Sequence, residues 1–102
     1  MRLDPERALL GAVLLNGPGA YPALDRVFAA QFTDPRCREI FEAMRALRAR
    51  AEEIDPLTVR NEMASRGAAS RGSAVFVASL IDGLPRTTDA FVFAREIAMR
   101  AN

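Results

Sequence analysis

Hydrophobic residues recur at helical spacings along most of the chain, and three of the stretches with this pattern open with the same dipeptide. An aspartate side chain accepts hydrogen bonds from the free N–H groups of a first helical turn. Proline fits the first helical position because its missing N–H would have no partner within the helix. The dipeptide therefore predicts a helix start wherever an apolar periodic stretch follows it. It occurs at Asp4-Pro5, Asp34-Pro35 and Asp55-Pro56.

The first of these helices is predicted to cover Pro5 to Leu15. Its run from Ala8 to Leu15 is apolar on nearly every side, which is typical of a central, buried helix. The segment 16–19, with its two glycines and a proline, ends the helix. A short second helix is predicted from Tyr21 to Ala29. Three of its side chains are expected to face inward: Leu24, Val27 and Phe28.

The clearest periodicity predicts a third helix from Pro35 to Arg50. A fourth helix is predicted from Pro56 to Ser65, with Gly67 as its stop. The lone cysteine lies on the apolar stripe of the third helix, and we interpret it as a buried, inert thiol because the sequence has no histidine or lysine to activate it. The stripe is formed by Cys37, Ile40, Phe41, Met44 and Leu47.

The remaining third of the chain predicts two more helices. Residues 67–72 form a loop, and the stretch Ser73–Ile81 that follows is predicted as a helix because no second strand-like run exists to pair with it. After a turn at Asp82–Pro85, the last helix is predicted from Thr88 to Ala101. The predicted fold is a single all-α domain over residues 1–102, a compact orthogonal bundle of five to six short helices.

Composition excludes most catalytic chemistry. All 14 basic residues are arginine, histidine is absent and there is one cysteine. These counts exclude a P-loop or Schiff-base lysine, a histidine-dependent general base and a cysteine- or histidine-ligated metal site. We therefore expect no catalytic, cofactor-binding or metal-binding residues in this chain. No apolar run approaches the roughly 20 residues that cross a bilayer, so no membrane association is expected.

Arginines gather on the predicted third helix, and they allow two interpretations. The first is a phosphate-facing stripe of a nucleic-acid-binding domain. The second, which we favour, is a solvated face, because nearby acidic residues offset its charge and the whole chain carries a formal net charge of only +1. The arginines are Arg36, Arg38, Arg45, Arg48 and Arg50.

The last helix carries the candidate partner-binding residues, Phe91, Phe93 and Arg95. The two phenylalanines are two positions apart, about 200° around a helix. We expect that one core cannot take both rings, so that one of them meets a neighbouring element or another chain.

Four segments, in order and in spacing, resemble the N-terminal domain of the bacterial replicative DNA helicases, the DnaB family. The first resembles the family's opening helix, E-x-x-[VL]-L-G, and the second its F-x-D-P-x-H-x-x-I-F-x-A-M segment, with cysteine in place of the histidine. The third resembles I-D-x-[VLI]-T, and the fourth a proline turn followed by a tyrosine-alanine pair, here Phe93-Ala94. The segments are Glu6–Asn16, Phe32–Met44, Ile54–Val59 and Leu84–Pro85 with Phe93–Ala94.

The resemblance implies a non-catalytic, cytoplasmic head domain that belongs to the collar of a hexameric helicase and docks primase, through its C-terminal domain, or a helicase loader. It also implies that ATP and magnesium belong to a downstream motor domain, which we expect to be absent here. For the isolated domain we expect a monomer with weak dimerisation, and indirect or weak contact with DNA. The alternatives are a small helical nucleic-acid-binding domain and a stand-alone regulator of primase.

Overall fold

The helices that follow the Asp-Pro pairs begin where the sequence predicts. The structure, a computed structural model, describes residues 3–67 and 73–100. Helix α1 covers Pro5–Asn16, α2 covers Pro35–Ala49 and α3 covers Pro56–Ser65. Each starts at the proline of its pair, and the predicted bounds of α3 are confirmed at both ends.

All three aspartates cap their helices through the side chain. The carboxylate of Asp4 accepts the N–H of Glu6 at 3.2 Å, and that of Asp34 accepts the N–H of Arg36 at 2.9 Å. Asp55 forms a reciprocal cap with Thr58: its carboxylate accepts the Thr58 N–H, and its own N–H donates to the Thr58 hydroxyl, both at 2.9 Å. Such caps satisfy backbone donors that the first helical turn leaves free.

The predicted second helix is wrong in type and in extent. The chain instead forms a 3₁₀ helix, η1, over Gly17–Arg26, and a single 3₁₀ turn, η2, over Ala29–Gln31. Pro22 lies inside η1 and removes one backbone donor, and the backbone is extended at Val27 and Phe28.

The extended backbone also changes which side chains face inward. Leu24 and Val27 are buried as predicted, but Phe28 is 67% exposed. Neighbouring side chains of an extended segment point to opposite sides, so the burial of Val27 turns Phe28 outward.

The second half of the described chain contains two further helices and no strand. Helix α4 covers Ser73–Ile81, as predicted, and α5 covers Ala90–Arg100. Gly67 adopts a φ of +71° after α3, which confirms it as the stop of that helix. The start of α5 lies two residues after the predicted one, because the carboxylate of Asp89 accepts the N–H of Phe91 at 2.9 Å and thereby caps the helix. Parts of the predicted loop (68–72) and of the predicted helix end (101–102) lie outside the described residues.

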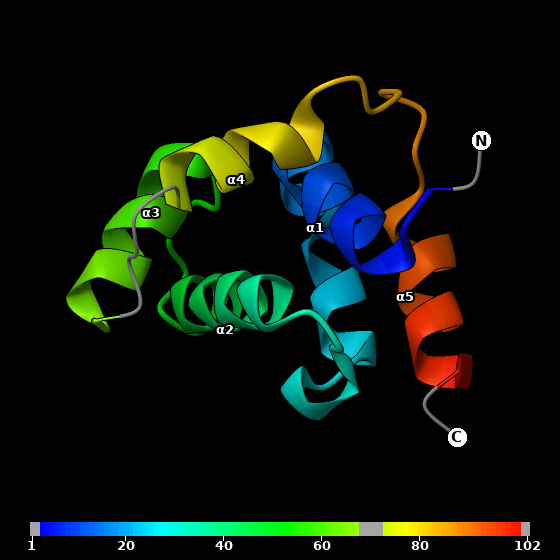
Figure 1. The fold of residues 1–102 in the computed structure, drawn as a ribbon, viewed down its shortest axis with the longest axis horizontal. Coiled ribbons are helices and arrows are strands. Elements are labelled where there is room, and N and C mark those ends of the chain that lie inside the picture. Colours follow the sequence, from blue (N-terminus) through cyan, green and yellow to red (C-terminus); the bar gives the residue numbers. More distant parts are fainter. Residues whose placement is uncertain (1–2, 68–72, 101–102) are drawn as a thin grey trace.

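Helix α1 occupies the middle of the all-α bundle (Figure 1). It packs along α5 on one side and contacts α2 and α4 on the other, while α3 closes the far end against α2 and α4. α2 lies across the direction of α5, so the helices cross rather than run parallel (Figure 1). The core includes Leu9, Leu10 and Val13 of α1, each with no exposed surface, which confirms the predicted central helix.

Candidate docking face on the last helix

Both phenylalanines of α5 contact the core, so the expectation that the core would take only one is wrong. Phe91 and Phe93 are each partly buried against the hydrophobic core. Between them, the innermost side of α5 is formed by Ala90, Ala94 and Ile97, all buried. This buried side belongs to a helix that packs on α1, and we refer to it as the seam of α5. A separation of about 200° therefore places the two rings on either side of the seam.

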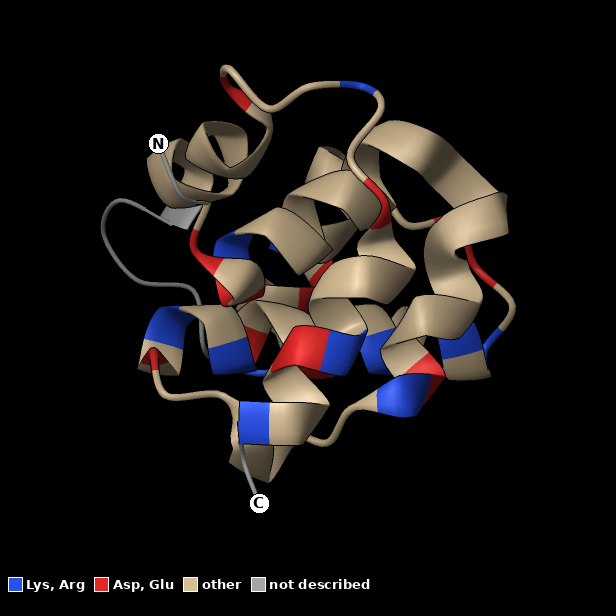
Figure 2. Ribbon diagram, turned by 90° about the vertical axis from the view of Figure 1, so that its right-hand side faces the viewer, with Lys and Arg blue, Asp and Glu red and all other residues tan. Residues whose placement is uncertain are grey.

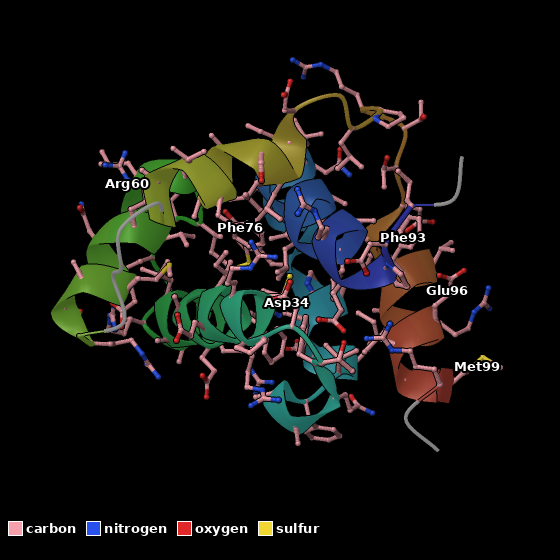
Figure 3. The ribbon with its side chains drawn as sticks, viewed as in Figure 1. Asp34, Arg60, Phe76, Phe93, Glu96 and Met99 are labelled. Carbon is pink, nitrogen blue, oxygen red and sulfur yellow. The ribbon has the colours of Figure 1, made fainter. Side chains whose placement is uncertain are left out.

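The opposite side of α5 faces solvent and carries exposed apolar residues. Val92 is 39% exposed and Met99 is 69% exposed. They are seven positions apart, two helical turns, and so lie on one face together with the exposed Arg95. In Figure 3, Met99 and Glu96 project from α5 away from the rest of the molecule, whereas Phe93 lies on the side of α5 toward α1.

A groove runs beside α5 where η1 meets it. It has a volume of about 610 Å³ and is open to solvent. The guanidinium carbon of Arg26, in the last turn of η1, lies 5.2 Å from the centre of the Phe91 ring, a cation–π contact that joins the two elements. Of the predicted partner-binding residues, the groove contains Phe91 and Arg95 but not Phe93. Its lining consists of Arg26, Asp89, Phe91, Val92, Arg95 and Ala98.

A buried carboxylate near the start of α1 fixes the end of α5. Glu6 is 1% exposed. One carboxylate oxygen accepts the Thr33 N–H at 2.9 Å and the Thr33 hydroxyl at 2.6 Å, and the other accepts the Asp34 N–H at 3.1 Å. The Arg100 guanidinium completes the cluster with an ion pair to Glu6. The network ties α1, the start of α2 and the last turn of α5 together.

The same contacts determine the protonation of Glu6. Burial by itself would raise the pKa of the Glu6 carboxyl, but the hydrogen bonds from Thr33, from the Asp34 backbone and from Arg100 outweigh it. The pKa therefore lies below its ordinary value of 4.5. A lowered pKa in the folded state stabilises the fold above the unfolded-state pKa, and this stabilisation is lost as the pH falls through the folded-state value.

We therefore expect the free energy of unfolding of the wild type to fall more steeply below about pH 4.5 than that of Glu6→Gln. Glutamine has no carboxyl to protonate, so this contribution is missing from the variant. Urea unfolding followed by circular dichroism at a series of pH values measures the difference. Equal pH slopes for the two proteins would contradict the placement of Glu6.

Most of the arginines predicted on the third helix have carboxylate partners within the fold; Arg50, the predicted last residue, is the cap that follows α2. Arg36 pairs with Asp34 at 3.0 Å, Arg48 pairs with Asp25 at 2.8 Å, and Arg50 pairs with Glu62 at 2.6 Å and also with Glu52. The hydrogen bond from Arg48 lowers the pKa of the Asp25 carboxyl. These pairs offset the positive charge of the helix.

The other two α2 arginines contact uncharged groups. Arg38 donates to the Phe32 carbonyl at 2.8 Å, and Arg45 lies 5.7 Å from the centre of the Phe41 ring. Figure 2 turns the α5 side of the molecule toward the viewer, and basic and acidic positions are both present on that side as well. The arrangement favours the solvated-face interpretation of the α2 arginines over a phosphate-facing stripe.

The lone cysteine is placed as predicted. Cys37 is fully buried on α2, and burial, with smaller contributions from nearby acidic groups, raises the pKa of its thiol to about 12. A thiol with so high a pKa is protonated at neutral pH and is a poor nucleophile. Within residues 3–67 and 73–100, no three metal-ligating side chains come together. None of the helices described is long and apolar enough to span a lipid bilayer.

No role was assigned from the sequence to three residues of this region. Glu6 was only the first residue of the family's opening motif, and its ion-pair partner Arg100 lies 94 positions away. Arg26 belongs to a helix whose type was wrongly predicted. Val92 belongs to the last helix but was not among its candidate partner-binding residues. The seven-residue spacing between Val92 and Met99, two helical turns, is the signal in the sequence that indicates an apolar outer face on this helix.

Comparison with known proteins gives one consistent result. The family model described as the DnaB-like helicase N terminal domain matches residues 1–99. The chain is 30% identical over 100 residues to the replicative DNA helicase DnaB of Mycobacterium leprae, a match that covers 97% of this chain and 17% of the relative. It is 31% identical over 102 residues to DnaB of Treponema pallidum, covering 96% of this chain and 23% of the relative. The chain thus spans about a fifth of the length of these helicases.

A solved structure agrees with the sequence matches. The crystal structure of the N-terminal domain of DnaB helicase from Mycobacterium tuberculosis superposes with a TM-score of 0.87 at 29% sequence identity. The match covers 95% of this chain and 68% of that one. The order and packing of the helices described above are therefore shared with that domain.

Proposed function

Because the chain belongs to the DnaB-like helicase N-terminal domain family, we propose that it is the non-catalytic head of a replicative DNA helicase, a protein-docking module. Its role is to bind primase, through the primase C-terminal domain, or a helicase loader, and to contribute to the collar of a hexameric helicase in the bacterial cytoplasm. The family match over residues 1–99 is the observation that carries this proposal.

Three features of the chain itself support a docking role without catalysis. The sequence contains no lysine and no histidine, and so no P-loop. We therefore assign ATP and magnesium to a motor domain outside this chain. The exposed face of α5 carries apolar residues beside an open groove, and such surfaces are typical of protein–protein contacts. The ion pairs of the α2 arginines favour this role over nucleic-acid binding, so we expect only weak, salt-sensitive contact with DNA.

Within this role, we assign the docking contact to Phe91, Phe93 and Arg95. Phe91 and Arg95 line the groove beside α5, and Phe93 supports the helix from the opposite edge of its contact with the core. Partly exposed aromatic and arginine side chains are favoured anchors at interfaces. Weak self-association of the isolated domain would use the same exposed face.

Alanine substitution of Phe91 and Arg95, the two residues that line the groove, distinguishes a docking role from a purely structural one. Phe91→Ala and Arg95→Ala are each expected to weaken binding of the cognate primase C-terminal domain by about tenfold, or more than 1 kcal/mol. Arg95→Ala is expected to leave the melting temperature nearly unchanged, because Arg95 is exposed. Calorimetric titration and thermal unfolding measure the two effects.

Arg60→Ala is the matched control, since Arg60 is an exposed arginine on α3, at the opposite end of the molecule from α5 (Figure 3). The assignment of the docking contact to α5 is wrong if Phe91→Ala only lowers the melting temperature and Arg95→Ala binds primase like the wild type.

A further inference from the structure

The groove between η1 and α5 is lined by both apolar and basic side chains. Phe91, Val92 and Ala98 supply the apolar part, and Arg26 and Arg95 supply the guanidinium groups. Val92 is 39% exposed, so the apolar lining extends onto the open face of the helix. A surface of this composition suits a ligand that brings both apolar and negatively charged groups.

The two arginines differ from most of those on α2 in having no carboxylate partner. Among residues 3–67 and 73–100, neither Arg26 nor Arg95 forms an ion pair, whereas Arg36, Arg48 and Arg50 each do. Arg26 is held over the Phe91 ring by its cation–π contact, which still leaves its N–H donors available.

The one acidic residue of the groove is already engaged within the fold. The Asp89 carboxylate accepts the Phe91 N–H at 2.9 Å as the cap of α5. The groove therefore holds two guanidinium groups and one carboxylate, an excess of positive charge, and each guanidinium has a planar set of donors that matches a carboxylate. Charge complementarity selects an acidic partner over a basic one.

From these observations we propose that the groove between η1 and α5 binds an acidic amphipathic helix of a partner protein. Its apolar face would seat on Phe91 and Val92, and its carboxylates would pair with Arg26 and Arg95. The inference rests on the proposed docking function. It adds two residues, Arg26 and Val92, and states the chemistry of the partner segment. A helix laid in an apolar groove, with charges at its edges, is a recurrent mode of peptide recognition.

Two designed peptides serve as probes. Both are amphipathic helices with the same leucine and phenylalanine positions on one face; one carries glutamates on the other face and the second carries lysines. Fluorescence anisotropy at low and moderate salt is used to compare their affinities for the 102-residue chain. We expect the acidic helix to bind more tightly than the basic one by about tenfold or more. Its affinity should fall as salt screens the contacts.

Charge reversal then locates the contact. Arg26→Glu and Arg95→Glu are each expected to weaken binding of the acidic helix by about tenfold. The matched control, Arg60→Glu, makes the same charge change on α3 and should leave the affinity near that of the wild type. Thermal unfolding of each variant shows whether the fold is retained, and Arg95→Ala provides a second, milder variant at the exposed position.

Three results would overturn the inference: no binding of the acidic helix, equal binding of the two helices, or undiminished binding to folded Arg26→Glu and Arg95→Glu. Titration of the same proteins with the primase C-terminal domain separates this inference from the proposed function. If the acidic helix binds in the groove and primase does not bind, the groove is supported and the assignment of primase is wrong. If primase binds and the acidic helix does not, the groove is wrong and the docking function stands.

Discussion

Replacing Glu6 with alanine is expected to lower the free energy of unfolding by about 2–4 kcal/mol. The substitution removes a carboxylate that is 1% exposed and accepts three hydrogen bonds from Thr33 and Asp34. It also leaves the Arg100 guanidinium without its partner. The donors left behind are partly or fully exposed and can turn to water. The expected loss therefore comes from several charge-assisted hydrogen bonds together and from the cavity left by a buried side chain.

Urea unfolding of wild type, Glu6→Ala and Glu39→Ala measures this effect. Glu39 is an exposed residue of α2, and its removal is expected to change stability by less than about 0.5 kcal/mol. Because a domain of this size has only about 5–15 kcal/mol of stability, Glu6→Ala should lose a substantial part of it, and its urea midpoint should fall clearly below that of the wild type. If Glu6→Ala and Glu39→Ala unfold at the same urea concentration, the hydrogen bonds and the ion pair of Glu6 contribute little to the stability of the fold.

Replacing Gly11 with alanine is expected to destabilise the fold by about 3 kcal/mol. Gly11 lies in the middle of α1, where alanine ordinarily favours a helix by about 1 kcal/mol. Here an added Cβ would overlap the main-chain carbonyl oxygen of Leu80 and lie 2.7 Å from a Leu84 methyl carbon. The main chain of α4 cannot move aside as a side chain can, so α1 and α4 would have to separate.

Gly19→Ala is the matched control, because a Cβ at Gly19 meets nothing within 4 Å and the residue has no positive φ. Unfolding in guanidinium chloride measures the free energy of unfolding of both variants. We expect that of Gly11→Ala to lie well below the wild-type value and that of Gly19→Ala to lie within about 0.5 kcal/mol of it. Similar midpoints for both variants would contradict the close approach of α1 and α4.

Local signals in the sequence were sufficient for most of the helices. Asp4, Asp34 and Asp55 act on the turn that follows them, so their caps could be recognised without any knowledge of the tertiary fold. The stop at Gly67 is equally local. The segment 17–31 was harder to interpret, because its apolar spacing suits a helix while Pro22 and two glycines favour the shorter 3₁₀ turns that the chain adopts.

The candidate site depended on contacts that the sequence could not show. A separation of two positions correctly places the Phe91 and Phe93 side chains on different sides of α5. What the spacing does not show is that Ala90, Ala94 and Ile97, between the two rings, are buried, and that both rings therefore border the same core. The burial of Glu6 needs Arg100 from the other end of the described chain, and the groove needs Arg26 from η1. Long-range packing, rather than local propensity, determines this surface.

Titration of the domain with the cognate primase C-terminal domain and with the cognate helicase loader tests the proposed docking function most directly. Calorimetry at physiological salt is expected to show saturable binding of at least one of them, and that binding should be weaker for Arg95→Ala than for Arg60→Ala. Absence of binding to both proteins, by a domain that unfolds cooperatively and is therefore folded, would contradict the assignment of this chain as a docking module.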